Sequence, residues 1–176
     1  MNGETILLVL SDSHGRPDRI TQAYKSIGKA DEILFLGDGV RDLDRADIGE
    51  KTPICVRGNC DSLGYFSNND IPTERMLCFG EYNILMTHGH MLGVKSSLER
   101  AVIYASQRKA DVLLYGHTHI KNELYLPSGE AVGEIVLQKP LRVFSPGSIG
   151  APREGRPSFG VITIRGKHIL SSFGEI

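Results

Sequence analysis

Two histidines, His117 and His119, stand two positions apart directly after the apolar run at residues 110–115. Alternate residues of a strand face the same side, so both imidazoles can point into one site where that strand ends. Histidine is the commonest protein ligand of divalent metals. The pair by itself is equally compatible with two packed or solvated rings, so the rest of the chain must decide.

Polar residues able to bind a metal also follow each earlier apolar run. With the two histidines, they are Asp12, His14, Asp38, Asn59, His88, His117 and His119. Carboxylate, imidazole and amide groups without a thiolate suit Mn²⁺, Fe, Zn²⁺ or Ni²⁺ better than they suit a structural zinc site. Seven ligands are too many for one ion, but they suit two ions that share a carboxylate. Two metals about 3.5–4 Å apart form a clamp for in-line attack on phosphorus.

The elements that position these residues can be predicted from the apolar pattern. Residues 5–10 (TILLVL) predict a strand buried on both faces, and residues 32–36 and 53–56 predict two more. Pro17 suits a first helical turn, and an apolar stripe at helical spacing then predicts a helix that ends at Gly28. Strand, helix, strand is a βαβ unit with parallel strands, and sites form beyond the carboxyl ends of such strands.

The remaining elements complete an α/β fold. Residues 63–73 predict a loop, Gly80-Glu81 a hairpin turn between strands at 75–79 and 82–86, and residues 94–108 an amphipathic helix before a strand at 112–115. After His119 we expect short antiparallel strands at 123–126, 134–137, 142–144, 160–164 and 168–170. The prediction is a sandwich of two sheets flanked by helices, in one domain spanning residues 1–176.

Composition restricts the classes of function. The chain has 176 residues, 40% of them hydrophobic and 23% charged, with a net charge of −1, and it contains no basic block. It therefore predicts neither a stable nucleic-acid surface nor a membrane surface. The N-terminus lacks the basic region of a signal peptide, and no apolar run approaches a transmembrane length. The three cysteines show no zinc spacing, and we expect a reducing, cytoplasmic setting.

Five short motifs occur in a recognisable order, each at the end of a predicted strand. They are Asp12-x-His14, Gly37-Asp38, Gly58-Asn59-Cys60-Asp61, Thr87-His88-Gly89-His90 and Gly116-His117-Thr118-His119. Single pieces of this kind carry no weight, whereas five in order do. Over residues 6–148 the chain resembles the calcineurin-like metallophosphoesterases, and in particular the small bacterial and archaeal phosphodiesterases of the YfcE/MJ0936 type. The resemblance implies an α-β-β-α sandwich of two mixed sheets and hydrolysis of phosphoric esters.

The resemblance also implies a division of the ligands between two divalent ions. The first ion would be held by Asp12, His14, Asp38 and His119. The second would be held by Asp38, Asn59, His88 and His117, with Asp38 bridging the two. Manganese is expected first, with Ni, Fe, Zn or Mg as alternatives, and a hydroxide shared by the ions would attack phosphorus. The amide group of Asn59 could also donate to a phosphoryl oxygen.

Two further residues of the motifs keep alternative interpretations. His90 is expected either as a catalytic residue that contacts substrate near the leaving group or first ion, or as a packed histidine. Cys60 stands where many relatives carry a histidine general acid, so it is either a weak catalytic substitute or a small core residue. Asp61 either orients a neighbour or caps a turn, and His168 is interpreted as a surface strand residue.

Two segments depart from the family pattern. Ser145-Pro146-Gly147-Ser148 replaces the common Asn-Pro-Gly-Ser, and we expect the turn to survive. Residues 121–139 predict an extended hairpin with Ser128-Gly129 at a turn, which could shade the site or mediate self-association.

The sequence therefore favours a dinuclear metal-dependent phosphodiesterase acting on a small phosphodiester. A thiol in place of the histidine acid favours esters with good leaving groups, and the branch with cysteine is associated with diesters. The alternatives are a phosphomonoesterase or protein phosphatase, and a non-catalytic interaction scaffold like the retromer subunit Vps29, which shares the fold. Intact ligand positions favour the enzyme. The physiological substrate and a homo-oligomer, dimer or tetramer, are left open.

Overall fold

The apolar run near the N-terminus forms the centre of the first sheet. The computed structural model describes residues 3–61 and 71–176, and β1 (Glu4–Leu10) lies between a parallel and an antiparallel neighbour. The strand order is β12-β11-β1-β2-β3, in which β1, β2 and β3 are parallel, β11 is antiparallel to β1, and β12 is antiparallel to β11. The other four strands are β2 (Glu32–Phe35), β3 (Ile54–Cys55), β11 (Ser158–Arg165) and β12 (His168–Glu175).

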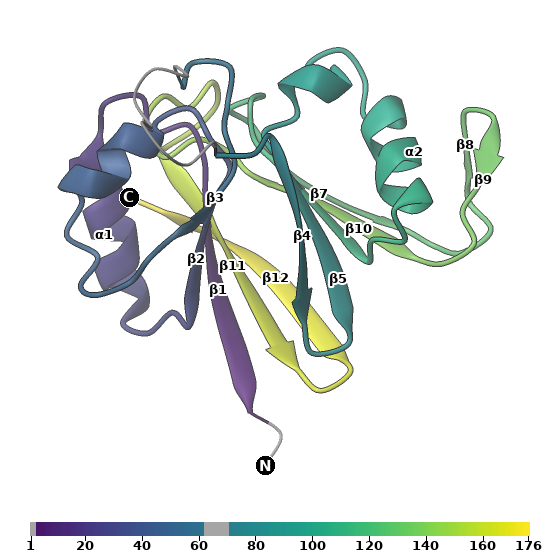
Figure 1. The fold of residues 1–176 in the computed structure, drawn as a ribbon, viewed down its shortest axis with the longest axis horizontal. Coiled ribbons are helices and arrows are strands. Elements are labelled where there is room, and N and C mark those ends of the chain that lie inside the picture. The colour runs from purple at the N-terminus through teal and green to yellow at the C-terminus, as the bar shows by residue number, and fades with distance from the viewer. Residues whose placement is uncertain (1–2, 62–70) are drawn as a thin grey trace.

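The second sheet also contains three adjacent parallel strands, which come from a different part of the chain. Its order is β4-β5-β6-β10-β7, in which β5, β6 and β10 are parallel and the two edge strands antiparallel. Its strands are β4 (Glu74–Phe79), β5 (Tyr82–Thr87), β6 (Val112–Tyr115), β7 (Lys121–Leu126) and β10 (Leu141–Pro146). The two sheets lie face to face, and both point the carboxyl ends of their parallel strands toward one edge (Figure 1).

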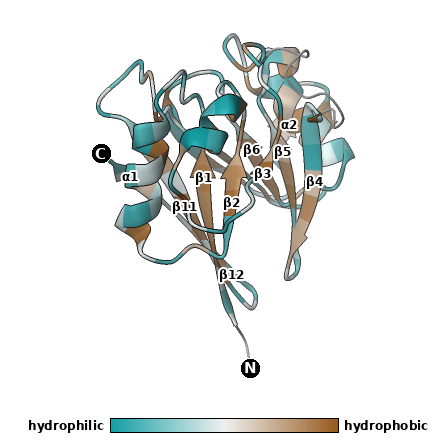
Figure 2. Ribbon diagram, turned by 60° about the vertical axis from the view of Figure 1, so that its left-hand side comes forward, coloured by the Kyte–Doolittle hydropathy of each residue, from teal (hydrophilic) through white to brown (hydrophobic). Residues whose placement is uncertain are grey.

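One helix covers the outer face of each sheet. The helix α1 (Pro17–Ile27) buries Ile20 and Ala23 against the first sheet, as the apolar stripe predicts, and ends at Gly28, whose φ of 73° a glycine adopts without strain. The helix α2 (Glu99–Gln107) buries Ala101, Val102 and Ala105 against the second sheet. Figure 2 shows α1 with hydrophilic residues among its turns beside the largely hydrophobic strands β1 and β2.

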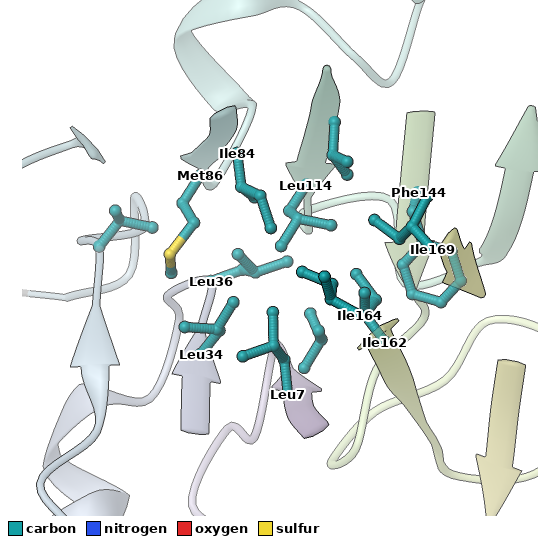
Figure 3. Packing of buried hydrophobic residues seen from close by; sticks show 13 residues of the cluster. Leu7, Leu34, Leu36, Ile84, Met86, Leu114, Phe144, Ile162, Ile164 and Ile169 are labelled. Carbon is teal, nitrogen blue, oxygen red and sulfur yellow. The ribbon is translucent and has the colours of Figure 1, made fainter. Parts of the chain in front are cut away.

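Alternation along the strands divides the core into three layers. In β1, Leu7 and Val9 face the second sheet, whereas Leu8 and Leu10 face α1. In β6, Val112 and Leu114 face the first sheet, whereas Leu113 and Tyr115 face α2. Figure 3 shows the central layer, where Leu7, Leu34 and Ile162 of the first sheet meet Ile84 and Leu114 of the second. The predicted α/β sandwich of two mixed sheets flanked by helices is confirmed.

The helix predicted over residues 94–108 begins later than predicted. Residues 94–98 form turns after a short 3₁₀ helix, η3 (His90–Leu92), which ends at Gly93 with a left-handed φ of 69°. The Ser97 hydroxyl then accepts the backbone N–H of Glu99, two residues on, at 3.1 Å. A serine that binds a following backbone N–H favours a helix start over a helix interior, which explains the later beginning.

The predictions for the last third of the chain need three corrections. The strand predicted over 134–137 is shorter than expected, since only β9 (Ile135–Val136) forms there, and it pairs across a turn at Gly133-Glu134 with β8 (Ala131–Val132), which was not predicted. The extended hairpin over 121–139 is also wrong, since β7 pairs with β10, although Ser128-Gly129 does form a turn. Finally, β10 is parallel to β6, so antiparallel pairing is not universal there.

The remaining observations concern a predicted loop, a second short helix, the membrane-span criterion and the cysteines. The loop predicted over residues 63–73 lies mostly outside the described residues. Another 3₁₀ helix, η1 (Val40–Arg45), follows β2. Among the helices described, none has the length and hydrophobicity that a membrane span requires. Cys55, Cys60 and Cys78 are all free thiols.

Candidate metal centre

The parallel strands of both sheets bring all seven predicted ligands to one edge of the sandwich. Two of the ligands follow β1, one follows β2 and one follows β3, and the second sheet supplies one after β5 and two after β6. Because the carboxyl ends of these strands converge, residues more than 100 positions apart in the chain come into contact. Their side chains form two groups.

The first group contains Asp12, His14 and His119. The Nε2 atom of His119 lies 3.1 Å from Asp12 Oδ1, and His14 Nε2 lies 3.7 Å from the same oxygen. The two Nε2 atoms are 3.2 Å apart. Three potential ligand atoms thus converge within 4.8 Å of one another, around a carboxylate that is completely buried.

The second group contains Asp38, His88 and His117, with Asn59 beside them. The Nε2 atom of His88 lies 3.4 Å from Asp38 Oδ2, 3.1 Å from His117 Nδ1 and 3.2 Å from Asn59 Oδ1. The amide oxygen of Asn59 therefore faces the same point as the ligand atoms of the group. His88 and Asp38 are both buried, whereas in the first group only Asp12 is buried and His14 is exposed, so the second group is the less accessible one.

A single carboxylate oxygen faces both groups. Asp38 Oδ2 lies 3.4 Å from His88 Nε2 in the second group and 3.9 Å from His14 Nε2 in the first. The other oxygen, Asp38 Oδ1, accepts the backbone N–H of Cys60 at 2.7 Å. Asp12 is held similarly, since its Oδ2 accepts hydrogen bonds from the Ser11 hydroxyl and from the backbone N–H of His117. Each carboxylate thus has one fixed oxygen and one directed into the site.

The hydrogen bonds of two imidazoles leave lone pairs in the site. His88 Nδ1 lies 2.8 Å from the carbonyl oxygen of Leu36, and His119 Nδ1 lies 2.6 Å from that of Ala151. A carbonyl oxygen can only accept, so both Nδ1 atoms carry a proton, which leaves Nε2 as the ring atom of each histidine that can bind a metal at the centre. Asp12 Oδ1 is buried and has no hydrogen-bond partner among the described residues. Lone pairs that face one another require a cation, and this donor set fits a divalent metal.

The pKa shifts of the site residues also favour a bound cation. Burial opposes ionisation of Asp12 and Asp38, yet neighbouring imidazoles outweigh it and hold the pKa of Asp12 well below its usual range and that of Asp38 at about 2. The pKa of His14 is raised, chiefly by Asp12, and that of His88 is raised by Asp38 despite burial. Burial, His88 and Lys95 lower the pKa of His117 to about 4. The pocket favours positive charge between fixed carboxylates.

The backbone at the ligands adopts an unusual conformation. Within the described ranges, six non-glycine residues have a positive φ: Lys109 and five of the predicted ligands, which are Asp12, His14, Asp38, His117 and His119. Such conformations cost free energy and persist where the surrounding structure enforces them, typically at functional sites. The positive φ values also correct the expectation that strand alternation orients His117 and His119. The strand ends at Tyr115, so left-handed backbone rather than strand alternation sends His117 and His119 to different groups.

The structure also positions the two other residues predicted as catalytic. His90 lies against the second group, with its ring centroid 5.3 Å from that of His88 and 6.1 Å from that of His117, rather than near the first. Cys60 is exposed, so its interpretation as a core residue is wrong. Its Sγ is close enough to the ligand atoms of His14 and Asp38 to join them around an ion. Burial and Asp38 raise the pKa of this thiol to about 11.

Two supporting residues have larger roles than the sequence indicates. The Asp61 carboxylate accepts four backbone N–H groups, from Asp38, Gly39, Val40 and Gly58, at 2.8–3.0 Å. It therefore joins the loops that carry Asp38 and Asn59. Its place in the Gly-Asn-Cys-Asp motif is the signal that could have identified it.

The second supporting residue is Ser148, in the departing Ser-Pro-Gly-Ser segment. Its buried hydroxyl donates to the carbonyl oxygen of Asp12 at 2.7 Å and accepts the backbone N–H of Ala151 at 2.7 Å. Ala151 in turn accepts the proton of His119 Nδ1. The expected turn is not formed as such, since Ser145 and Pro146 end β10 and Gly147, at a φ of 81°, begins a loop, but this loop fixes two members of the first group.

Comparison with known proteins gives two similar sequences and a domain match. The calcineurin-like phosphoesterase superfamily domain matches residues 6–167. The probable metallophosphoesterase YsnB of Bacillus subtilis (strain 168) is 32% identical over 160 residues, which cover 90% of this chain and 83% of that protein. Phosphodiesterase YfcE of Escherichia coli (strain K12) is 30% identical over 180 residues, covering 89% of this chain and 86% of that one.

A solved structure shares the fold at lower identity. Vacuolar Protein Sorting 29 from Cryptosporidium parvum superposes with a TM-score of 0.68 at 17% identity, covering 98% of this chain and 99% of that one. At this identity the likeness concerns the fold alone. The choice between a catalytic and a non-catalytic protein depends on the side chains at the sheet edge.

Proposed function

This chain belongs to the calcineurin-like phosphoesterase superfamily, and from that premise we propose that it is a dinuclear, metal-dependent phosphodiesterase. The observation that carries the proposal is Asp38 Oδ2, which faces both ligand groups at 3.4 and 3.9 Å from their nearest histidine nitrogens. A carboxylate oxygen in that position is suited to bridge two cations.

The proposed ligands follow the two groups. Asp12, His14, Asp38 and His119 would hold the first ion, and Asp38, Asn59, His88 and His117 the second. Two divalent ions held there would lower the pKa of a water molecule and neutralise the charge of a bound phosphate. The mixed nitrogen and oxygen donors suit manganese, and nickel, iron, zinc or magnesium are the alternatives. The nearby thiol of Cys60 would favour the softer of these metals.

The protein's own groups would orient the ester and move protons. Asn59 has its amide oxygen on the second group and its amide nitrogen turned to Cys60, so displacement of the thiol by a phosphoryl oxygen would give that oxygen a donor. His90 has a buried Nδ1 without a partner among the described residues, and burial followed by His88 lowers its pKa. It would therefore contact the substrate as a neutral ring.

One observation favours diesters over monoesters, and a second indicates which leaving groups are favoured. The relative YfcE is named a phosphodiesterase. In this chain Cys60 replaces a histidine acid, and a thiol with a pKa of about 11 is a weak proton donor at neutral pH. Leaving groups that need no proton, such as nitrophenolate, should therefore depart fastest. The non-catalytic alternative lacks support of this kind, since every predicted ligand lies in the site.

The test is a reconstitution panel on metal-stripped protein. Mn²⁺, Ni²⁺, Fe²⁺, Zn²⁺ and Mg²⁺ are added separately, and hydrolysis of bis(4-nitrophenyl) phosphate is compared with that of 4-nitrophenyl phosphate. We expect no turnover without metal and faster turnover of the diester with at least one ion. Faster monoester turnover would replace the diesterase by a monoesterase, and inactivity with every ion would support a non-catalytic protein.

A further inference from the structure

A groove beside the metal centre has the chemistry of a second binding site. It lies on the side of the second sheet, has a volume of about 290 Å³ and is lined by residues from β6, β7, the turns before α2 and the segment after β10. None of these lining residues belongs to the two ligand groups. The groove is separate from the cavity of about 210 Å³ around His14, Asp38 and Cys60.

The groove adjoins the metal centre, because segments that carry both histidine motifs also form its wall. Thr118, which lines the groove, stands between His117 and His119. Val94, also in its wall, packs against Gly89, where an added Cβ would lie only 2.8 Å from the valine Cγ2. A substrate held at the ligand groups therefore has this groove beside it.

The groove is positively charged. Lys95, Lys121 and Arg153 line it, and no carboxylate does so among the described residues. Lys121 is paired with Glu175, but Lys95 and Arg153 form no ion pair within the described part of the chain. The cavity on the other side is lined by Asp38, Asp42 and Asp61. Negative charge on a substrate is thus favoured on the side of the second sheet.

The inner part of the groove offers an apolar wall and one polar group. Val94, Leu98 and Ile120 supply aliphatic surface. The Tyr115 ring is 2% exposed, and its hydroxyl accepts a hydrogen bond from Asn122 at 2.8 Å. Its own proton is then free to be donated. Such a groove suits a small ring or aliphatic group that ends in an anion.

We propose that this groove binds the second ester arm of the substrate and selects arms that carry an additional anionic group, a carboxylate or a phosphate, through Lys95 and Arg153. The inference rests on the proposed phosphodiesterase function and adds a substrate class to it. The preferred diesters carry a charge beyond that of the diester itself.

Three diesters that release the same nitrophenolate test the proposal: 4-nitrophenyl phenyl phosphate and its 4-carboxyphenyl and 4-phosphonophenyl counterparts. We expect kcat/KM to be roughly five- to tenfold higher for the anionic arms, since a partly exposed charge contact contributes about 1 kcal/mol. The carboxylate and phosphonate arms distinguish the two anions. The preference should decrease with added salt.

The variants K95M and R153M, when combined, should reduce the preference to about twofold or less, measured as the ratio of kcat/KM for the anionic and phenyl esters within the same variant. K167M is the matched control, because Lys167 is an exposed lysine in the β11–β12 turn, at the far end of the first sheet, and should keep the preference. Both lining cations are exposed, so the variants should fold, which circular dichroism checks. Equal turnover of all three esters, or a preference that survives the double variant, would overturn the inference alone. No turnover of any ester would overturn the proposed function with it.

Discussion

The carboxylate of Asp61 accepts the backbone N–H of Asp38 at 2.8 Å and that of Gly58 at 2.9 Å through the same oxygen. Its other oxygen accepts the backbone N–H groups of Gly39 and Val40. One side chain thereby fixes the distance between the loops that follow β2 and β3. The position of the Asp38 carboxylate thus depends on a residue that is not itself one of the proposed ligands.

Replacing Asp61 by asparagine should destabilise the protein and weaken metal binding. The amide presents N–H to two of the four backbone donors, and each lost charged hydrogen bond contributes about 1.5–3 kcal/mol. We expect the free energy of unfolding in urea to fall by about 3–6 kcal/mol in total. Asp47→Asn is the control, since Asp47 forms an exposed ion pair with Lys25 whose loss should leave the stability nearly unchanged. Equal losses for the two variants would refute this role of Asp61.

Replacing Gly58 by alanine should displace Asp38 while leaving the protein folded. The added Cβ would lie 2.1 Å from Asp38 Oδ1 and 2.5 Å from the Asp38 backbone nitrogen. The side chain must move, and we expect metal affinity to fall by about 10–100-fold, as for other losses of ligand support. Gly3→Ala is the control, because nothing lies within 4 Å of its added Cβ. Bound metal measured after dialysis compares the two, and unchanged content in Gly58→Ala would contradict the close approach.

The two ligand groups should differ in the metal that each substitution removes. His119→Ala should leave the second group loaded, and His117→Ala the first, so each variant should bind about one equivalent instead of two. Asp38→Asn should lower both. All three should lose nearly all bis(4-nitrophenyl) phosphate turnover. His168→Ala is the control, since His168 is exposed at the start of β12. Metal analysis of purified variants gives the counts, and a full complement in Asp38→Asn would exclude the bridging role.

The thiol of Cys60 should react slowly in metal-free protein. Burial and the negative charge of Asp38 disfavour the thiolate and raise the thiol pKa to about 11. In a variant whose other two cysteines are serine, alkylation by iodoacetamide should therefore increase with pH until about pH 11. Adding Asp38→Asn removes the nearest charge and should shift this midpoint downward. A midpoint near 8.5 in the protein with Asp38 intact would show an unperturbed thiol.

Much of the fold follows from local pattern. The run at residues 5–10 has no polar interruption, so a strand covered on both faces is its only stable setting, and alternation then assigns Leu7 and Leu8 to different layers. The hairpin β8–β9 and the late start of α2 escape such reasoning. A turn at Gly133 and a hydroxyl of Ser97 decide them, and apolar spacing does not register either.

The candidate site likewise has some features that the sequence predicts and others that it does not. Residue types and their places after strands predict which side chains meet, because parallel strands end together. The left-handed backbone at Asp12 and His117 cannot be predicted in that way, since neither residue is a glycine and the strain is enforced by contacts distant in the chain. The partners of Ser148 lie in loops that only the folded chain brings together.

Titration of metal into stripped wild-type protein tests the central claim most directly. Bound Mn²⁺ and hydrolysis of bis(4-nitrophenyl) phosphate are measured in the same samples as the metal-to-protein ratio increases. Two ions sharing Asp38 predict turnover that stays low through the first equivalent, appears with the second and reaches a plateau at two. Undiminished turnover in the stripped protein with chelator present, or a plateau at one equivalent, would contradict a dinuclear phosphodiesterase.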